Sequence, residues 1–122
     1  MKRVLDVGNC DPDHRAITSF LTSNFDVTVD RARLPADTFE KLAAGDYHLV
    51  VINRKLDEDY SDGLEIIRQM KADERMSDVP VMLVTNLAEH QDAAEAAGAL
   101  RGFGKLEYND PSAVERVAAV LG

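Results

Sequence analysis

VPVMLVT at residues 79–85 is one of two near-continuous apolar runs in the chain, and HLVVIN at residues 48–53 is the other. Short runs that are rich in β-branched residues and lack polar alternation are typical of strands buried on both faces of a parallel sheet. We therefore predict that these two strands are central. Further strands are predicted outward from them at residues 3–7, 26–30 and 101–104.

Stretches with helical spacing alternate with these strands. Helices are predicted to begin with Asp11 as N-cap and Pro12 in the first turn, after Pro35, at Asp62, over residues 88–97, and after Pro111. Alternating strands and helices indicate βαβ units. The predicted fold class is therefore α/β, with residues 1–122 forming one (βα)5 domain around a doubly wound, parallel five-stranded sheet.

Length, charge and cysteine count exclude several classes of function and location. A length of 122 residues fits one domain, and no apolar run is long enough to span a bilayer, so no membrane partner is expected. The 14 basic residues are scattered among 22 acidic ones, and the net charge of −8 argues against direct nucleic-acid binding. The single Cys10 and the absence of a signal-peptide pattern predict a reducing, cytoplasmic location.

In doubly wound sheets, functional groups lie in the loops at the carboxyl ends of the strands. Those loops are predicted at residues 8–13, 54–61, 85–88 and 105–109. Any site is therefore expected where these four loops meet.

Five short motifs resemble a known family. They are DGLEII at residues 62–67, KAD at 71–73, VPVMLVT at 79–85, AGA at 97–99 and FGK at 103–105. In this order and spacing they resemble the receiver domains of bacterial response regulators, the CheY-like, flavodoxin-like modules of two-component phosphorelay signalling. The resemblance implies that Thr85 supplies the hydroxyl that contacts a phosphoryl group and that Lys105 is the lysine that pairs with it.

The chain departs from the family where the chemistry takes place. The resemblance puts Asn53 in the position of the phosphoacceptor aspartate, and an amide forms no acyl phosphate. The Mg²⁺-binding acidic pair falls on Gly8 and Asn9 or on Asn9 and Cys10, so we expect weak or absent Mg²⁺ binding and no cofactor. The predicted pocket consists of Asn9, Cys10, Asp11, Thr85 and Lys105, with Lys105 pairing with Asp11 or Asp57 or attracting an anion.

Other polar residues have two interpretations each. Arg54 and Lys55 either hold an anion or are solvated. The acidic residues after them form either a divalent-cation loop or a solvated loop, and their spacing is not that of a calcium-binding loop. These residues are Asp57, Glu58, Asp59 and Asp62. Cys10 and His14 form either a redox or metal switch or a small buried thiol beside a surface imidazole. Asp6 interrupts an apolar strand, so it requires a hydrogen-bond partner or a raised pKa.

The resemblance also implies an interaction face formed by the fourth helix, the fifth strand and the last helix, with Glu89, Glu95, Arg101 and Phe103 as candidate contacts. Because no nucleophile has an adjacent base, no enzyme activity is expected. We predict a phosphorylation-independent pseudo-receiver that contacts a sensor kinase, an output domain or another receiver, with a homodimer as one such arrangement. The alternatives are a conventional receiver using Asp11 or Asp57, and an anion or nucleotide sensor using the same crevice.

Overall fold

A computed structural model describes all 122 residues and contains five strands and five helices in strict alternation. The strands are β1 (Lys2–Val7), β2 (Val27–Ala32), β3 (Leu49–Asn53), β4 (Val81–Val84) and β5 (Leu100–Phe103). The helices are α1 (Asp11–Asn24), α2 (Pro35–Ala44), α3 (Gly63–Ala72), α4 (Ala88–Ala96) and α5 (Pro111–Leu121). The predicted (βα)5 architecture is confirmed.

All neighbouring strands pair in parallel, in the order β2-β1-β3-β4-β5. β3 lies in the middle of the sheet and β4 beside it, so the prediction that these two strands are internal is confirmed. Every residue of β4 is buried, as are the first four residues of β3. The apolar runs therefore correspond to strands covered on both faces.

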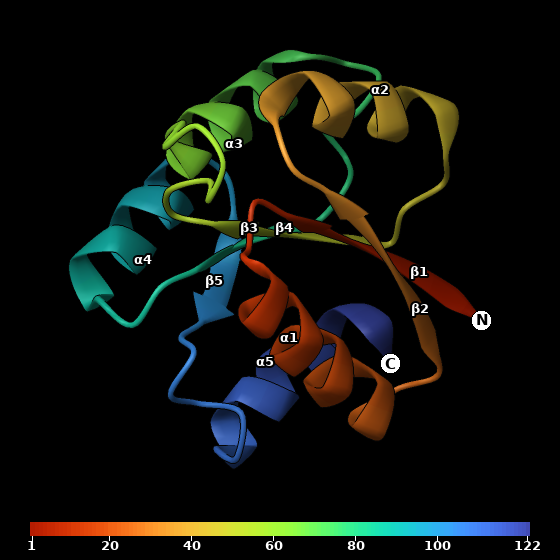
Figure 1. Cartoon of the computed structure of the whole chain (residues 1–122), viewed down its shortest axis with the longest axis vertical. Coiled ribbons are helices and arrows are strands. Elements are labelled where there is room, and N and C mark those ends of the chain that lie inside the picture. Colours follow the sequence, from red (N-terminus) through yellow and green to blue (C-terminus); the bar gives the residue numbers. More distant parts are fainter.

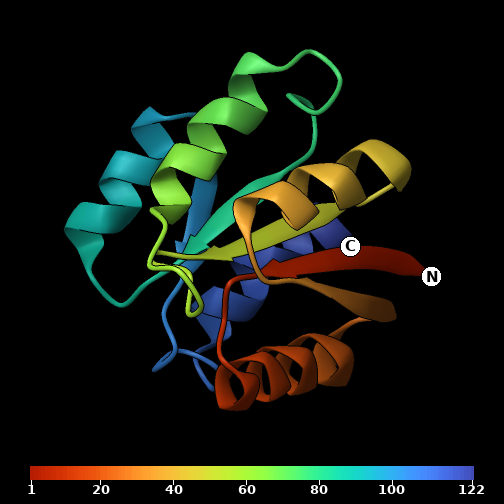
Figure 2. The ribbon, with the colours of Figure 1, turned by 45° about the horizontal axis from the view of Figure 1, so that its top comes forward.

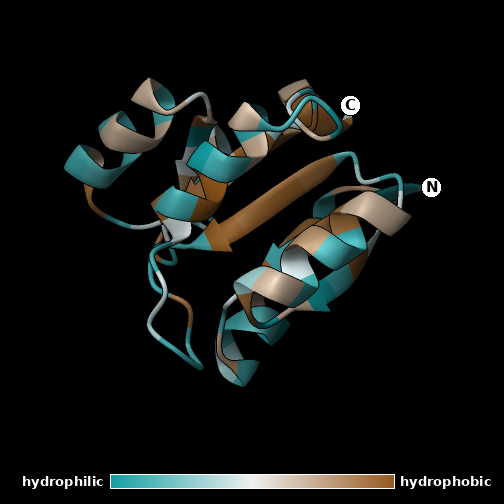
Figure 3. Cartoon of the chain, turned by 90° about the horizontal axis from the view of Figure 1, so that it is seen from above, coloured by the Kyte–Doolittle hydropathy of each residue, from teal (hydrophilic) through white to brown (hydrophobic).

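Helices cover both faces of the sheet, as Figures 1 and 2 show: α2, α3 and α4 lie on one face, and α1 and α5 on the other. Each face has its own apolar core. Leu42, Ile67 and Met70 belong to the first core, and Phe20 and Val117 belong to the second. Figure 3 shows a hydrophobic strand in the middle of the molecule and helices in which hydrophilic and hydrophobic residues alternate.

The helix starts agree with the prediction at α3 and differ from it at α1. Asp62 caps α3 as predicted, because its carboxylate accepts a hydrogen bond from the Leu64 amide at 2.9 Å. The prediction for α1 was wrong: Cys10 occupies the N-cap position, without a side-chain hydrogen bond, and Asp11 is the first helical residue. The Asp11 carboxylate instead contacts the guanidinium of Arg31 on β2 at 2.7 Å.

The helices are also short. None of them is both long and apolar enough to cross a membrane.

Candidate functional site at the carboxyl edge of the sheet

The loops that follow β1, β3, β4 and β5 meet at one edge of the sheet, as parallel pairing requires. Asn53 is the last residue of β3, and Thr85 directly follows β4. On β1, Asp6 and Val7 pair with Val51 and Ile52 of β3, which brings Asn9 and Cys10 to the same edge. The predicted pocket residues therefore come from neighbouring strand ends.

Asp6 is fully buried, and the partners that its position requires are present. The amide nitrogen of Asn9 donates to Asp6 Oδ1 at 2.6 Å, and His14 Nδ1 lies 2.6 Å from Asp6 Oδ2. Burial raises the pKa of Asp6, while the hydrogen bonds from His14 and Asn9 act in the opposite direction. The sequence required a hydrogen-bond partner or a raised pKa for Asp6, and the structure provides two partners for it.

Lys105 forms an ion pair, but with a residue outside the predicted pocket. Its Nζ lies 2.6 Å from Asp13 Oδ2, and the Cys10 thiol donates to the same oxygen at 3.2 Å. Burial tends to raise the pKa of Asp13, but the hydrogen bonds from Lys105 and Cys10 outweigh it and lower that pKa. The prediction that Lys105 pairs with Asp11 or Asp57 was wrong, because Asp13 on the first turn of α1 faces the lysine.

Asp11 was also wrongly placed in the pocket. Its side chain is 63% exposed and lies between Arg31 at 2.7 Å and Arg33 at 3.7 Å. The hydrogen bond from Arg31 lowers the pKa of Asp11. Two arginines from β2 and the residues after it therefore hold this carboxylate away from Lys105.

The Thr85 hydroxyl already takes part in a chain of hydrogen bonds. The Arg54 Nε–H donates to His90 Nε2 at 3.1 Å, so the other ring nitrogen of a neutral His90 carries the proton. That nitrogen, Nδ1, lies 3.3 Å from Thr85 Oγ1, which also accepts from the Leu87 amide at 3.3 Å. These partners of His90 were not predictable from its neighbours in sequence, because they come from residues 54 and 85.

The segment after β3 folds into a small hairpin closed by an antiparallel bridge between Lys55 and Asp62. The side-chain amide of Asn53 donates to the Lys55 carbonyl at 2.7 Å and so braces the start of this hairpin. At its end, the Gly63 amide donates to the Arg54 carbonyl at 2.8 Å. Asn53 therefore has a structural partner at the strand end.

Leu56 fixes the hairpin against the end of β1. Its side chain is fully buried, and the Asp57 amide next to it donates to the Gly8 carbonyl at 2.8 Å. Gly8 has a φ of +75°, and a Cβ on Gly8 would overlap Leu56 Cγ. A glycine at the end of β1 is thus required both by the backbone and by the leucine packed on it.

Acidic residues of the hairpin have hydrogen-bond and ion-pair partners within the protein. No three His, Cys, Asp or Glu side chains of the chain are grouped so that they could hold a metal ion. Asp59 instead accepts hydrogen bonds from the amide and hydroxyl of Ser61, and Glu58 lies 3.4 Å from Arg33. The interpretation of this loop as a divalent-cation loop finds no support in the geometry.

One of the predicted interaction residues is misplaced. Phe103 is fully buried, and its ring packs on those of Phe20 and Tyr108 at centroid distances of 5.3 and 6.2 Å. It was wrongly expected on the surface because a short strand end gives no alternation to show its inward face. Glu89, Glu95 and Arg101 are exposed, and Arg101 forms an ion pair with Glu95 at 2.7 Å.

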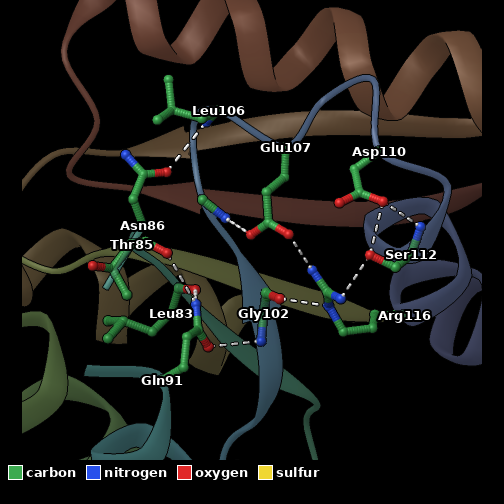
Figure 4. A network of polar contacts seen from close by, with 11 residues as sticks. Leu83, Thr85, Asn86, Gln91, Gly102, Leu106, Glu107, Asp110, Ser112 and Arg116 are labelled. Atoms are coloured by element: carbon green, nitrogen blue, oxygen red, sulfur yellow. Dashed lines mark hydrogen bonds and ion pairs between the residues drawn. The ribbon is translucent and has the colours of Figure 1, made fainter. Parts of the chain in front are cut away.

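A polar network between α4, β5 and α5, shown in Figure 4, had not been expected from the sequence. Buried Gln91 of α4 donates to the Leu83 carbonyl on β4 and accepts from the Gly102 amide on β5, both at 2.9 Å. Arg116 of α5 donates to the Gly102 carbonyl at 2.7 Å and contacts Glu107 at 2.9 Å. The register between β4 and β5 shifts at this point, so the Gln91 amide bridges the interrupted ladder.

No protein-family model matches the chain. A response-regulator candidate from Chloroflexus aurantiacus has a similar structure, with a TM-score of 0.84 and 18% identity over 98% of this chain and 97% of that one. The signal receiver domain of a DNA-binding response regulator from Colwellia psychrerythraea gives a TM-score of 0.82 and 19% identity, again over 98% and 97%. For the bacteriophytochrome response regulator AtBRR the TM-score is 0.78 and the identity 21%, over 100% and 95%. The chain therefore has the fold of the response-regulator receiver domain.

Proposed function

We propose that the chain is a receiver-type module of two-component signal transduction that acts as a pseudo-receiver, through protein contacts and without an aspartyl phosphate. It is not an enzyme in this proposal and needs neither Mg²⁺ nor another cofactor. The single observation that carries the proposal is Asn53 at the end of β3, whose amide donates to the Lys55 carbonyl. An amide at this position offers no carboxylate oxygen to attack a phosphodonor.

Three nearby carboxylates, those of Asp6, Asp11 and Asp13, support the proposal because each is already engaged. Asp6 is buried between Asn9 and His14, and Asp13 is bonded to Lys105. Asp11 faces Arg31, which disfavours the conventional receiver alternative that uses it. Because Lys105 already has an anionic partner, the pairing also favours the pseudo-receiver over the anion-sensing alternative, which needs that lysine for its ligand.

The partner in this proposal is a protein: a sensor kinase, an output domain or another receiver, including a second copy of the chain. Exposed Glu89, Glu95 and Arg101 on α4 and β5 are the proposed contacts. Asp92 and Glu95 hold Arg101 at 2.9 and 2.7 Å, so this face presents a fixed arrangement of charges. A reducing cytoplasm is the proposed location, in keeping with the single Cys10.

The test is intact-mass spectrometry after incubation with acetyl phosphate and Mg²⁺. The wild-type chain is expected to gain no hydroxylamine-sensitive phosphoryl group. Asn53→Asp, treated in parallel, shows whether a carboxylate alone restores acceptor chemistry. A stoichiometric, hydroxylamine-sensitive phosphoryl group on the wild-type chain that is lost in Asp11→Ala or Asp57→Ala would overturn the proposal in favour of the conventional receiver.

A further inference from the structure

His14 and Asp6 form a dyad that the proposed function does not use. His14 Nδ1 lies 2.6 Å from Asp6 Oδ2, and Asn9 donates to the other Asp6 oxygen at 2.6 Å. A carboxylate oxygen at this distance accepts a hydrogen bond from a ring N–H, so Asp6 orients the imidazole of His14 with Nδ1 as the donor. In a neutral imidazole with its proton on Nδ1, the second nitrogen, Nε2, carries a free lone pair.

This second nitrogen faces the outside of the molecule. His14 Nε2 has no hydrogen-bond partner in the protein, and it is not among the buried polar atoms that lack one. The His14 side chain is 20% exposed. An imidazole oriented by a buried carboxylate at one nitrogen, with the other nitrogen open, is the arrangement of an activated histidine nucleophile or base.

The surface around His14 is suited to an anionic group. His14 lines a shallow depression of ≈ 450 Å³ together with Arg15, Thr18, Ser19 and Thr22. Arg15 is exposed and forms no ion pair, so its guanidinium is available. The Thr18 side chain, one helical turn after His14, lines the same depression.

The charge of this helix also differs from that of the rest of the chain. The chain contains 22 acidic residues, yet none lies between residues 14 and 24. Asp11 and Asp13 lie in the first turn of α1, but Asp11 is paired with Arg31 and Asp13 with Lys105. A negatively charged phosphodonor therefore meets less repulsion along residues 14–24 than along the acidic hairpin after β3.

We propose that His14 Nε2 is a phosphoryl acceptor that takes a phosphoryl group from a nitrogen-linked donor, such as a phosphohistidine or a phosphoramidate. The Nε2 lone pair forms a bond to phosphorus as the phosphorus–nitrogen bond of the protonated donor breaks, and the electron pair of that bond leaves with the donor nitrogen as ammonia or as a neutral imidazole. Nδ1 keeps its proton, hydrogen-bonded to Asp6, which compensates the positive charge on the phosphorylated ring. The exposed guanidinium of Arg15 contacts the phosphoryl oxygens.

This inference goes beyond the proposed function and does not depend on it. An aspartyl phosphate is hydrolysed by base and requires Mg²⁺ for its formation in receivers, whereas a phosphohistidine is stable to base and forms from phosphoramidate without a metal. The two modifications are therefore distinguishable on the same protein sample.

The experiment is incubation of the full chain with potassium phosphoramidate in the presence of EDTA, followed by intact-mass spectrometry and peptide mapping at alkaline pH. The wild-type chain is expected to gain one acid-labile phosphoryl group on His14. His14→Gln is expected to gain none, because glutamine retains a donor for Asp6 but has no nucleophilic nitrogen. His48→Gln and His90→Gln are the matched controls and are expected to be labelled like the wild type.

Asp6 acts as a positioning residue, and its role has its own test. Asp6→Asn is expected to slow labelling by about 10–100-fold, the range found when a group that orients a histidine is removed. The ¹⁵N chemical shifts of His14 report its tautomer and are expected to show loss of the Nδ1–H form in this variant, a change that a purely structural role of Asp6 would not produce. Arg15→Gln is expected to slow labelling by about fivefold, as for loss of an exposed charge contact.

Three results would overturn the inference: no phosphoryl gain on a folded wild-type chain, equal gain on His14→Gln, or mapping of the group to His48 or His90. Thermal unfolding of each variant shows that it is folded before labelling. If Asp6→Asn does not fold, His14→Gln and Arg15→Gln still decide the result, because both residues lie partly or fully on the surface.

Discussion

At the scale of single residues, Gly8 carries the largest local constraint at the edge of the sheet. Its φ of +75° and the overlap that a Cβ would make with Leu56 Cγ both exclude a side chain. We expect Gly8→Ala to lower the free energy of unfolding by about 1–3 kcal/mol, from backbone strain and overpacking. Urea denaturation measures this loss. Gly98→Ala is the comparison, because Gly98 also has a positive φ but lies against the flexible Lys71 side chain. An unchanged stability of Gly8→Ala would show that Gly8 is not constrained in this way.

Asp73 gives a prediction on pH. Hydrogen bonds from the Arg75 side chain and amide lower the pKa of Asp73 to about 2. Because the folded-state pKa lies below the unfolded-state value, this carboxylate stabilises the fold above the unfolded-state value, and the contribution is lost as pH falls towards about 2. NMR titration of the carboxyl carbon is expected to show this low pKa in the wild type and a value closer to the ordinary one in Arg75→Gln; equal values in both would contradict the assignment.

Single residues also show which side-chain contacts could not be predicted from the sequence. The requirement that Asp6 find a partner followed from one carboxylate in an apolar strand, but nothing local pointed to His14 in particular. Lys105 and Asp13 are separated by 92 positions in sequence, so their pairing depends on how α1 sits against the loop after β5. The sequence therefore predicted which residues lie at the strand ends, but it did not predict which side chains of different loops pair with each other.

At the scale of elements, the apolar runs and helix signals predicted the presence of every strand and helix, although the predicted N-cap of α1 was wrong and α4 begins after Leu87 without a side-chain cap. The hairpin after β3 and the bridge at Gly102 escaped prediction for a physical reason. Both depend on backbone groups that are bonded by side chains, by Asn53 in the hairpin and by Gln91 and Arg116 at Gly102, and such bonds leave no periodic pattern in the sequence.

Gln91 tests the bridge between β4 and β5. We expect Gln91→Leu to lower the free energy of unfolding by about 1–3 kcal/mol for each backbone group left without a partner, namely the Leu83 carbonyl and the Gly102 amide. Gln69→Leu, on the exposed face of α3, is the matched control and is expected to change stability little. Chemical denaturation measures the free energy of unfolding of the two variants. Equal losses in both would show that the Gln91 bridge does not contribute to stability.

At the scale of the whole molecule, the two apolar cores lie on opposite faces of one sheet and share its strands. β3, for example, contributes Val50 and Ile52 to one core and Leu49 and Val51 to the other. Neither core can persist when the sheet is lost, so we expect a single cooperative unfolding transition. The chain has no Trp and three Tyr, so tyrosine fluorescence and far-UV circular dichroism are the probes; separate midpoints would show that the two faces unfold independently.

Hydrogen exchange at the Gly102 amide gives a measure of how often α4 moves away from the sheet. Its amide hydrogen is held by the Gln91 side chain and not by a strand carbonyl, so solvent reaches it when α4 moves away and not only when the sheet separates. The exchange rate of that hydrogen for deuterium is therefore expected to report how often α4 opens, and to be faster than the rates within β3. A partner that docks on α4 would slow this exchange without altering the rates in β3.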